Sequence, residues 1–308
     1  MSNDDTLRQA VALYDRFTHE GMGRRAFMAE LTRIAGGSAA AGLLLSGIAA
    51  RAQSAPQVPA DDPRLRTDES ALRLGDLDIR TYRAIRQDLR PPRAWPRPPT
   101  VMVIHENRGL NDHIRDVARR FALAGYDAMA PDFLSLDGGA TPTDEDAART
   151  AIAALDMDRA IAAAVQLVRF RHEPKRVVRP FETEPTPVGI VGFCWGGAMV
   201  HRVALAAGSD LAAAVSFFGP APDPSEATRL ATPELVILAG RDARVNGTAQ
   251  PWIEAARAAG KSVEAITYPD VDHAFHNDTS AARYNQAAAE QAWSATLDFF
   301  ARHLRRDT

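Results

Sequence analysis

The sequence predicts an α/β fold in which a mostly parallel sheet is doubly wound, with helices on both faces. From Thr100 onward, short apolar runs of strand type alternate with longer segments of helical spacing. Glycines and polar residues follow the ends of several apolar runs, where parallel sheets place their functional groups. The chain has 308 residues, 46% of them hydrophobic, which is enough for one large α/β domain.

The N-terminal segment, residues 1–52, differs in composition from the rest of the chain. The run Gly23-Arg24-Arg25-Ala26-Phe27-Met28 resembles a twin-arginine export signal. The 17 residues from Ile34 to Ala50 carry no charge, and Ala50-Arg51-Ala52 offers an A-x-A cleavage site before Gln53. We therefore expect a signal peptide, a transient export machinery as partner, and a periplasmic or secreted mature protein. The alternatives are a cytoplasmic protein with an N-terminal helix, or a retained membrane anchor.

The next segments lead into the domain, which we expect to span residues 71–308. Residues 53–70 contain prolines and several acids, and this composition predicts a flexible linker. Residues 72–85 alternate apolar and polar side chains around Gly75-Asp76, which indicates a hairpin. Residues 91–99 hold five prolines, too many for a helix or a central strand, so a stiff connection is expected there.

The remaining elements follow in alternation. The pattern predicts strands at residues 100–105, 126–130, 187–191, 235–239 and 263–268, and the runs 100–105 and 187–191 are expected to be buried. Helical spacing predicts helices at residues 114–124, 155–170, 198–207 and 281–304. The first of these helices has Asn111 or Asp112 as its cap and Gly125 as its stop. Residues 135–147 are rich in Gly, Pro and Asp, which is typical of a long loop covering an active site.

Cys194 is the only cysteine of the chain, and it lies in Gly192-Phe193-Cys194-Trp195-Gly196-Gly197 between a predicted strand and a predicted helix. This pattern is the nucleophile elbow of α/β-hydrolases, with cysteine in place of serine. Glycines are needed there because the chain reverses sharply and its backbone must approach the substrate. A buried structural cysteine is the alternative. The glycines and the partners described next favour a catalytic thiol.

A base and an acid follow the nucleophile in the order that this fold uses. Asp242 comes just after the predicted strand 235–239, and His273 lies in the loop after the predicted strand 263–268. Both positions are strand ends, where α/β sheets carry catalytic groups. Asp272, next to the histidine, is an alternative to Asp242 as the acid.

The loop after the predicted strand 100–105 supplies the remaining part of the predicted site. In this fold one oxyanion-hole N–H comes from that loop and the other from the residue after the nucleophile. The candidates are the backbone amides of Asn107 and Trp195. Phe193 and Phe275, together with the Trp195 ring, are expected to line the substrate pocket.

Together these motifs resemble the dienelactone hydrolase family, the carboxymethylenebutenolidases, over about residues 72–304. The resemblance is carried by Ile104-His105-Glu106-Asn107-Arg108-Gly109, Gly192-Phe193-Cys194-Trp195-Gly196-Gly197, Asp242 and His273-Ala274-Phe275-His276-Asn277-Asp278. It implies the α/β-hydrolase fold and a triad of Cys194, His273 and Asp242. It also implies that Glu106 lies near the thiol and tunes its ionisation.

The chain departs from the family at one point that concerns the substrate. The resemblance implies arginines that bind a substrate carboxylate, one of them shortly after the catalytic histidine. Here no arginine follows His273 before Arg283, and Asn277 lies where the family has arginine. Arg108 and Arg244 are the candidates that could take over this role, and we place Arg108 in the expected substrate pocket.

A thiol nucleophile restricts the substrate, because the tetrahedral intermediate expels the better leaving group. A thiol pKa is about 8.5, whereas the pKa of a simple alcohol is far higher, like that of water. The expected function is therefore hydrolysis of activated esters or enol lactones through a thioester. Two other classes stay open: a non-catalytic binding protein of the same fold, and a thiol-dependent acyl transferase or peptidase.

Composition and spacing give no sign of other functions. The net charge of −3 and the 24% of charged residues do not suggest a nucleic-acid partner. No cofactor is implied, and no metal is expected: His105-Glu106 lacks the H-E-x-x-H spacing, and no Cys/His/carboxylate cluster surrounds His273 and His276. The expected partner is a small ester or lactone. The oligomeric state is not predicted.

Overall fold

The computed structural model describes residues 3–19, 22–49, 56–89, 97–173, 185–280 and 282–304. Backbone contacts divide this described chain into two compact units. The sheet unit comprises Pro56–Leu238, Ala243–Thr267 and Trp293–Thr308. The helix–loop unit comprises Met1–Ala55, Ala239–Asp242 and Tyr268–Ala292. Each unit has its own packing, described separately below.

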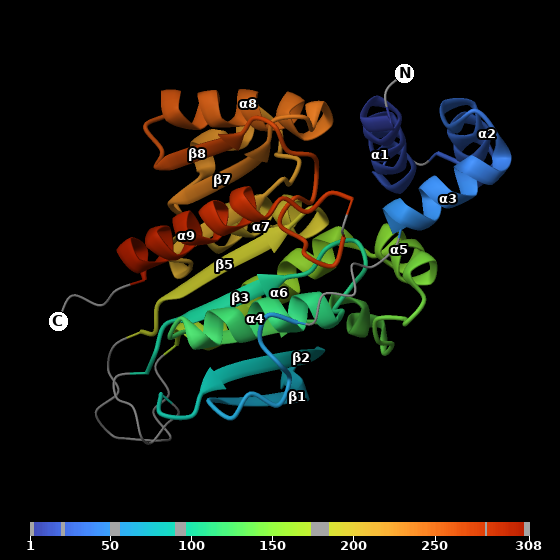
Figure 1. The fold of residues 1–308 in the computed structure, drawn as a ribbon. Helices are drawn as coiled ribbons and strands as arrows, with labels where there is room; N and C mark the ends of the chain where they lie inside the picture. The colour runs from blue at the N-terminus through green and yellow to red at the C-terminus, as the bar shows by residue number, and fades with distance from the viewer. Residues whose placement is uncertain are drawn as a thin grey trace. The chain divides into compact units, whose positions relative to one another are not determined.

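Within the described residues, eight strands form one sheet in the order β1-β2-β4-β3-β5-β6-β7-β8 (Figure 1). The strands β1 and β2 pair antiparallel, as do β2 and β4, whereas β3 with β4, β3 with β5, β5 with β6, and β6 with β7 pair parallel. The predicted mostly parallel α/β fold is therefore confirmed. The strand bounds are β1 Leu65–Leu74, β2 Leu77–Arg86, β3 Thr100–Ile104, β4 Asp127–Pro131, β5 Val188–Phe193, β6 Ala213–Phe217, β7 Glu234–Ala239 and β8 Val263–Tyr268.

The opening hairpin of β1 and β2 is confirmed, and it begins earlier than expected. Leu74 pairs with Leu77 across the turn, where Gly75 adopts a φ of 59° that favours glycine. Strand β1 already begins at Leu65, so the end of the segment 53–70, expected to be a linker, is strand instead. These residues form a strand because they pair with β2, and such pairing cannot be read from composition.

The described part of the expected linker before β1 is also attached to the domain. The Val58 N–H donates to Asp116 Oδ1 at 2.8 Å, and the Val58 carbonyl accepts from Arg119 Nε at 2.7 Å. Val58 itself is buried. Residues 53–55 lie outside the described residues.

The four helices predicted for the domain are present with shifted ends, and the helices Glu145–Ala154 and Ala243–Ala258 were not predicted. The Asn111 side chain caps the first predicted helix by accepting the Ile114 N–H at 3.1 Å. The expected loop 135–147 is shorter, because 3₁₀ and α-helix occupy its two ends, and the closing helix begins at Gln286 instead of 281. The bounds are α4 Asp112–Leu123, α5 Glu145–Ala154, α6 Met157–His172, α7 Trp195–Ala207, α8 Ala243–Ala258 and α9 Gln286–His303, with 3₁₀ turns η1 Phe133–Asp137, η2 Gly208–Asp210 and η3 Pro224–Arg229.

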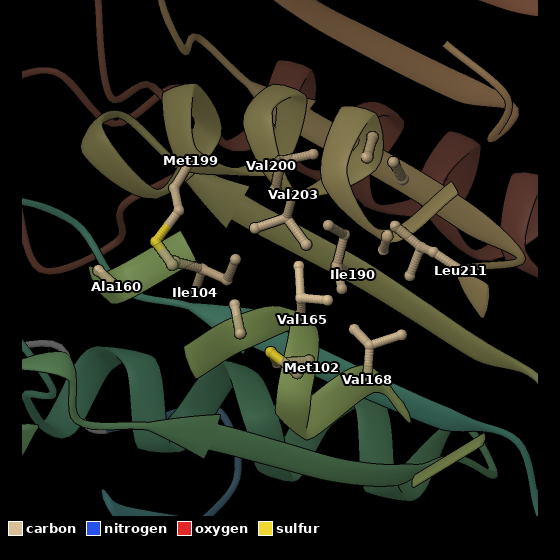
Figure 2. Packing of buried hydrophobic residues seen from close by; sticks show 14 of the residues in the cluster. Met102, Ile104, Ala160, Val165, Val168, Ile190, Met199, Val200, Val203 and Leu211 are labelled. Atoms are coloured by element: carbon tan, nitrogen blue, oxygen red, sulfur yellow. The ribbon is translucent and has the colours of Figure 1, made fainter. Parts of the chain in front are cut away.

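Side chains alternate between the two faces of β5, and each face meets different helices. Val188 and Ile190 belong to the core shared with α6 and α7. Gly189, between them, faces the Phe300 and Leu304 side chains, which would lie 2.9 Å from an added Cβ. The sheet is thus covered on both faces. Figure 2 shows the core on the face that packs against α6 and α7. It includes Met199, Val200 and Val203 of α7, Val165 and Val168 of α6, and Met102 and Ile104 of β3.

The helix–loop unit contains α1 (Asn3–His19), α2 (Arg24–Ala35) and α3 (Ser38–Ala49). These helices share buried apolar residues, and the rings of Phe17 and Phe27 stack at 4.4 Å. The uncharged stretch is interrupted at Gly36, which ends α2 with a φ of 75°. Within the described residues, no individual helix is long and apolar enough to cross a membrane, whereas α2 and α3 satisfy this criterion together but are bent by 106°. The cleavage motif at 50–52 lies outside the described residues.

Candidate active site

The backbone at Cys194 makes a sharp turn between β5 and α7. Cys194 adopts φ 57° and ψ −112°, a left-handed region that non-glycine residues rarely occupy. Its N–H donates to the Phe217 carbonyl of β6 at 3.0 Å, which holds the turn against the sheet. The residue is 4% exposed. A strained, recessed residue at a strand-to-helix turn is what a nucleophile elbow requires.

Two glycines make this turn possible. A Cβ on Gly192 would lie 2.2 Å from the Gly196 carbonyl oxygen, and a Cβ on Gly196 would lie 2.5 Å from the His105 carbonyl oxygen. Real Cβ atoms do not approach backbone atoms so closely. The first turn of α7 therefore packs directly against the chain that leaves β3, and both positions require glycine.

The loop after β3 lies in the same unit as Cys194. The Glu106 carbonyl accepts the Gly109 N–H at 3.2 Å and contacts His105 Nδ1 at 2.8 Å. Glu106 is buried and Asn107 is half-buried. Trp195 is the first residue of α7, and amides of a first helical turn have no carbonyl partner within the helix. The close approach at Gly196 brings this loop and the first turn of α7 together.

The predicted acid and base meet in the helix–loop unit. His273 Nδ1 and Asp242 Oδ2 are 2.5 Å apart, and both side chains are buried. The two loops that carry them are fastened by their backbones, because the Arg241 N–H donates to the Val271 carbonyl at 3.1 Å. This short bond lets Asp242 orient the imidazole.

Asp272, the alternative acid, has a different partner. Its carboxylate lies 3.6 Å from an Arg241 Nη atom, and that guanidinium also lies 3.6 Å from Asp270. Burial raises the pKa of Asp272, while the Arg241 charge lowers it. The hydrogen bond to His273 therefore favours Asp242 over Asp272 as the partner of the imidazole.

Comparison with known proteins identifies the family of the chain. Residues 89–304 match the model of the dienelactone hydrolase family.

The chain belongs to the dienelactone hydrolase family.

The relatives include the "Putative carboxymethylenebutenolidase" of Salmonella typhi, which is 31% identical over 216 residues, 67% of this chain and 77% of that protein. The "Protein usf" of Aquifex pyrophilus is 32% identical over 213 residues, 67% of this chain and 89% of that protein. A solved structure named as a "Putative Dienelactone Hydrolase" from Klebsiella pneumoniae subsp. pneumoniae MGH 78578 matches with a TM-score of 0.65 and 25% identity, and covers 77% of this chain and 99% of that one. As a member of this family, the chain is an ester or lactone hydrolase with the α/β-hydrolase fold.

Asn277, where the resemblance to the family implies a carboxylate-binding arginine, makes local structural contacts. Asn277 is buried, and its Oδ1 accepts from the Thr279 N–H at 3.0 Å and from the Thr279 hydroxyl at 2.7 Å. The next arginine, Arg283, is also buried and forms an ion pair with Asp15 of α1 at 2.9 Å. The Asn277 contact is a local turn, whereas the Arg283 pair joins residues 268 positions apart and depends on tertiary structure.

The residues expected to line the pocket divide into two kinds. Phe193 packs on Phe217 with ring centroids 4.8 Å apart, and Phe275 packs on Tyr268 at 5.3 Å; both phenylalanines are fully buried and serve as interior packing. Arg108 keeps some accessible surface and pairs with Glu145 of α5 at 3.3 Å. Trp195 is half-buried.

Sequence reasoning did not find the connection between the Glu106 loop and the segment before α5. Thr141 donates its hydroxyl to Asp132 at 2.8 Å and accepts the Leu110 N–H at 2.9 Å. Gly109 lies so close that an added Cβ would be 2.3 Å from the Thr141 hydroxyl. No local pattern marks this bridge, since its partners are 31 residues apart. Among the described residues, no group of three or more His, Cys, Asp or Glu side chains is arranged to hold a metal ion.

Proposed function

We propose that the protein hydrolyses activated esters or enol lactones through a thioester on Cys194, with His273 as the proton carrier and Asp242 as its orienting acid. The observation that carries this proposal is the strained elbow at Cys194, which a structural cysteine does not need. The bond between His273 and Asp242 supports it independently. Membership in a hydrolase family supports the reaction type.

Each residue has a role that follows from its chemistry. Asp242 accepts the Nδ1 proton of His273, so Nε2 is the atom that takes a proton from the thiol and returns it to the leaving group. The Cys194 sulfur attacks the carbonyl carbon, and the oxyanion is held by the backbone N–H groups of Asn107 and Trp195. Water then cleaves the thioester and returns the thiol.

The leaving group selects the substrate class. With a simple alkyl ester, the tetrahedral intermediate expels thiolate, whose conjugate acid has a pKa of about 8.5, faster than alkoxide. With an enol lactone or an aryl ester, the leaving oxygen is stabilised as an enolate or phenolate, and the reaction proceeds. Amides and alkyl esters are therefore expected to be poor substrates.

The test is a panel of enol lactones, aryl esters, alkyl esters and peptides, assayed for kcat/KM with the full chain. We expect activity on the first two classes and little on the others. Neutral and carboxylated lactones are compared in the same panel, and neutral ones should rival or outrun the anions, because Arg108 is paired with Glu145 and Asn277 replaces the family arginine. Peptide cleavage, transfer to an added alcohol or amine in place of water, or binding without turnover would each contradict the proposal and indicate one of the alternative classes.

Glu106 is proposed to restrain the thiol until substrate arrives. A carboxylate beside a thiol disfavours the thiolate by like-charge repulsion. Glu106→Gln should therefore make the resting thiol react faster with iodoacetamide at neutral pH, while lactone turnover falls. Alkylation rates measured against pH for both proteins check this, with Glu145→Gln as the control for loss of a carboxylate outside the elbow. An unchanged or slower alkylation of Glu106→Gln would refute the role.

Export through a twin-arginine signal is also proposed, on the pattern around Arg24 and Arg25 and the uncharged stretch after it. The double substitution Arg24→Lys with Arg25→Lys should leave the protein in the cytoplasm with its N-terminal segment uncleaved. The unsubstituted mature protein should begin near Gln53. Fractionation and N-terminal sequencing check this prediction, and unchanged export of the double variant would contradict it.

A further inference from the structure

His105 is a fully buried histidine that the proposed mechanism does not use. It directly follows β3 and precedes Glu106 and Asn107. Its Nδ1 lies 2.8 Å from the Glu106 carbonyl oxygen. A carbonyl only accepts hydrogen bonds, so Nδ1 carries the proton and donates. The Phe133 N–H points at Nε2 over a longer distance of 3.4 Å, which suits an unprotonated Nε2.

The bond from His105 to the Glu106 carbonyl acts on the neighbouring amide. The Glu106 C=O and the Asn107 N–H belong to one planar peptide group, and in a trans peptide these two groups point in opposite directions. Fixing the carbonyl therefore fixes the direction of the Asn107 N–H. That N–H is the donor that this loop contributes to the proposed oxyanion hole.

One face of the same imidazole meets the side chain of Trp195, the residue whose backbone N–H is the second proposed donor. The ring stacks on the Trp195 indole with centroids 5.2 Å apart and planes inclined by 9°. The Phe133 ring contacts both of these rings. Its centroid lies 5.6 Å from that of His105, in an edge-on arrangement, and 6.1 Å from that of Trp195, at a tilt. The backbones of the two residues are also close, because Gly196 lacks a Cβ and the His105 carbonyl can approach the first turn of α7.

The ring is suited to this place because it is uncharged. Burial lowers the pKa of His105, although the Glu106 carbonyl and the charges of Asp132 and Glu106 oppose the shift. A neutral imidazole keeps one donor and one acceptor nitrogen, which matches the two backbone partners.

We propose that His105 is a positioning residue for the oxyanion hole: one side chain orients the Asn107 amide through a hydrogen bond and places Trp195 through a ring stack. This inference rests on the proposed function, because it assigns a task in the acyl-transfer step. It assigns His105 no contact with substrate.

Three substitutions in the full chain separate the hydrogen bond from the ring. An asparagine amide nitrogen is as many bonds from the backbone as Nδ1, so His105→Asn retains the donor to the Glu106 carbonyl. His105→Gln places its amide at the position of Nε2 and lacks that donor, and His105→Phe keeps the ring without either nitrogen. We expect kcat for an aryl ester to fall about 10- to 100-fold in the Gln and Phe variants, part of the roughly 100- to 1,000-fold that loss of a whole donor costs. KM should change little, and His105→Asn should retain a kcat about tenfold above that of His105→Gln.

Alkylation of Cys194 by iodoacetamide provides a readout that bypasses the oxyanion hole, because displacement at a saturated carbon forms no tetrahedral oxyanion. We expect the alkylation rate and its pH dependence to stay within about twofold of the wild-type protein in variants whose kcat has fallen about tenfold or more. Circular dichroism identifies variants that fold, and if His105→Phe does not, the Asn and Gln pair decides.

The inference is overturned if kcat of the folded Gln or Phe variant stays near the wild-type value, if Asn and Gln lose activity equally, or if alkylation slows in proportion to hydrolysis. A wild-type protein that hydrolyses no ester or lactone in the panel would instead reject the proposed function, so the two failures are distinguishable.

Discussion

Replacing Cys194 by alanine should lower aryl-ester hydrolysis by about a thousandfold or more, because loss of a nucleophile removes the covalent route and leaves only the binding and oxyanion groups. The fold should persist, since Cys194 lies in a turn whose strain comes from its backbone and not from its sulfur. The measurements are kcat/KM on an aryl ester and the thermal unfolding midpoint. Iodoacetamide should label the unsubstituted protein at one site and the variant at none.

Cys194→Ser is the matched comparison, because it keeps the shape of the turn and changes the chemistry of the attacking atom. It should be much less active than the wild-type protein and retain the same unfolding midpoint. If Cys194→Ala retains more than a few per cent of the activity, the nucleophile has been assigned wrongly.

Asp242→Asn should lower kcat by up to about 10,000-fold, the loss seen when the acid of a serine–histidine–aspartate triad is made neutral and the imidazole takes the wrong tautomer. The buried hydrogen bond between Asp242 and His273 Nδ1 is the reason for expecting this loss. Measured kcat on an aryl ester, with KM determined in parallel, checks the size and shows whether the loss is in the chemical step.

Asp272→Asn is the control for this second prediction. Asp272 is the neighbour of His273 and pairs with Arg241, so its neutralisation should alter kcat only a few-fold. The reverse order, a larger loss for Asp272→Asn than for Asp242→Asn, would transfer the role of the acid to Asp272.

Patterns within short stretches of the sequence predicted most strands of the sheet, the cap of one helix and the turn at Cys194. The strands β3, β4, β5 and β7 are buried, mostly apolar runs, and β8 is partly buried. The cap of α4 at Asn111 is a side-chain hydrogen bond within one turn. The turn at Cys194 could also be anticipated, because the glycines around it are demanded by close backbone approaches. The strand runs, the helix cap and the glycine pattern around Cys194 are all visible in short stretches of the sequence, although Gly196 itself packs against the distant His105 carbonyl.

Features that depend on distant partners were missed. Strand β1 extends back to Leu65 because β2 pairs with it, and Val58 is held by Asp116 on α4. The pairing of Arg283 with Asp15 joins residues 268 positions apart. Propensity and spacing carry no information on such contacts.

The candidate site shows the same division. The residue types at Cys194, Asp242 and His273 and their order were readable, and Asp242 was preferred to Asp272 from the sequence; the hydrogen bond to His273 Nδ1, which only the structure shows, involves Asp242. His105 was read only as a non-metal residue, since its contact with Trp195 joins the end of β3 to the start of α7 and has no sequence signature.

The claim that Cys194 forms a thioester is tested most directly by trapping the intermediate. The full chain is mixed with a slowly turned-over aryl ester, quenched in acid within the first turnover, digested, and analysed by mass spectrometry. The account predicts an acyl group on the peptide that contains Cys194, which appears before steady state and is removed by hydroxylamine. An acyl group on any other residue, or hydrolysis that proceeds with no covalent adduct at any time point, would contradict it.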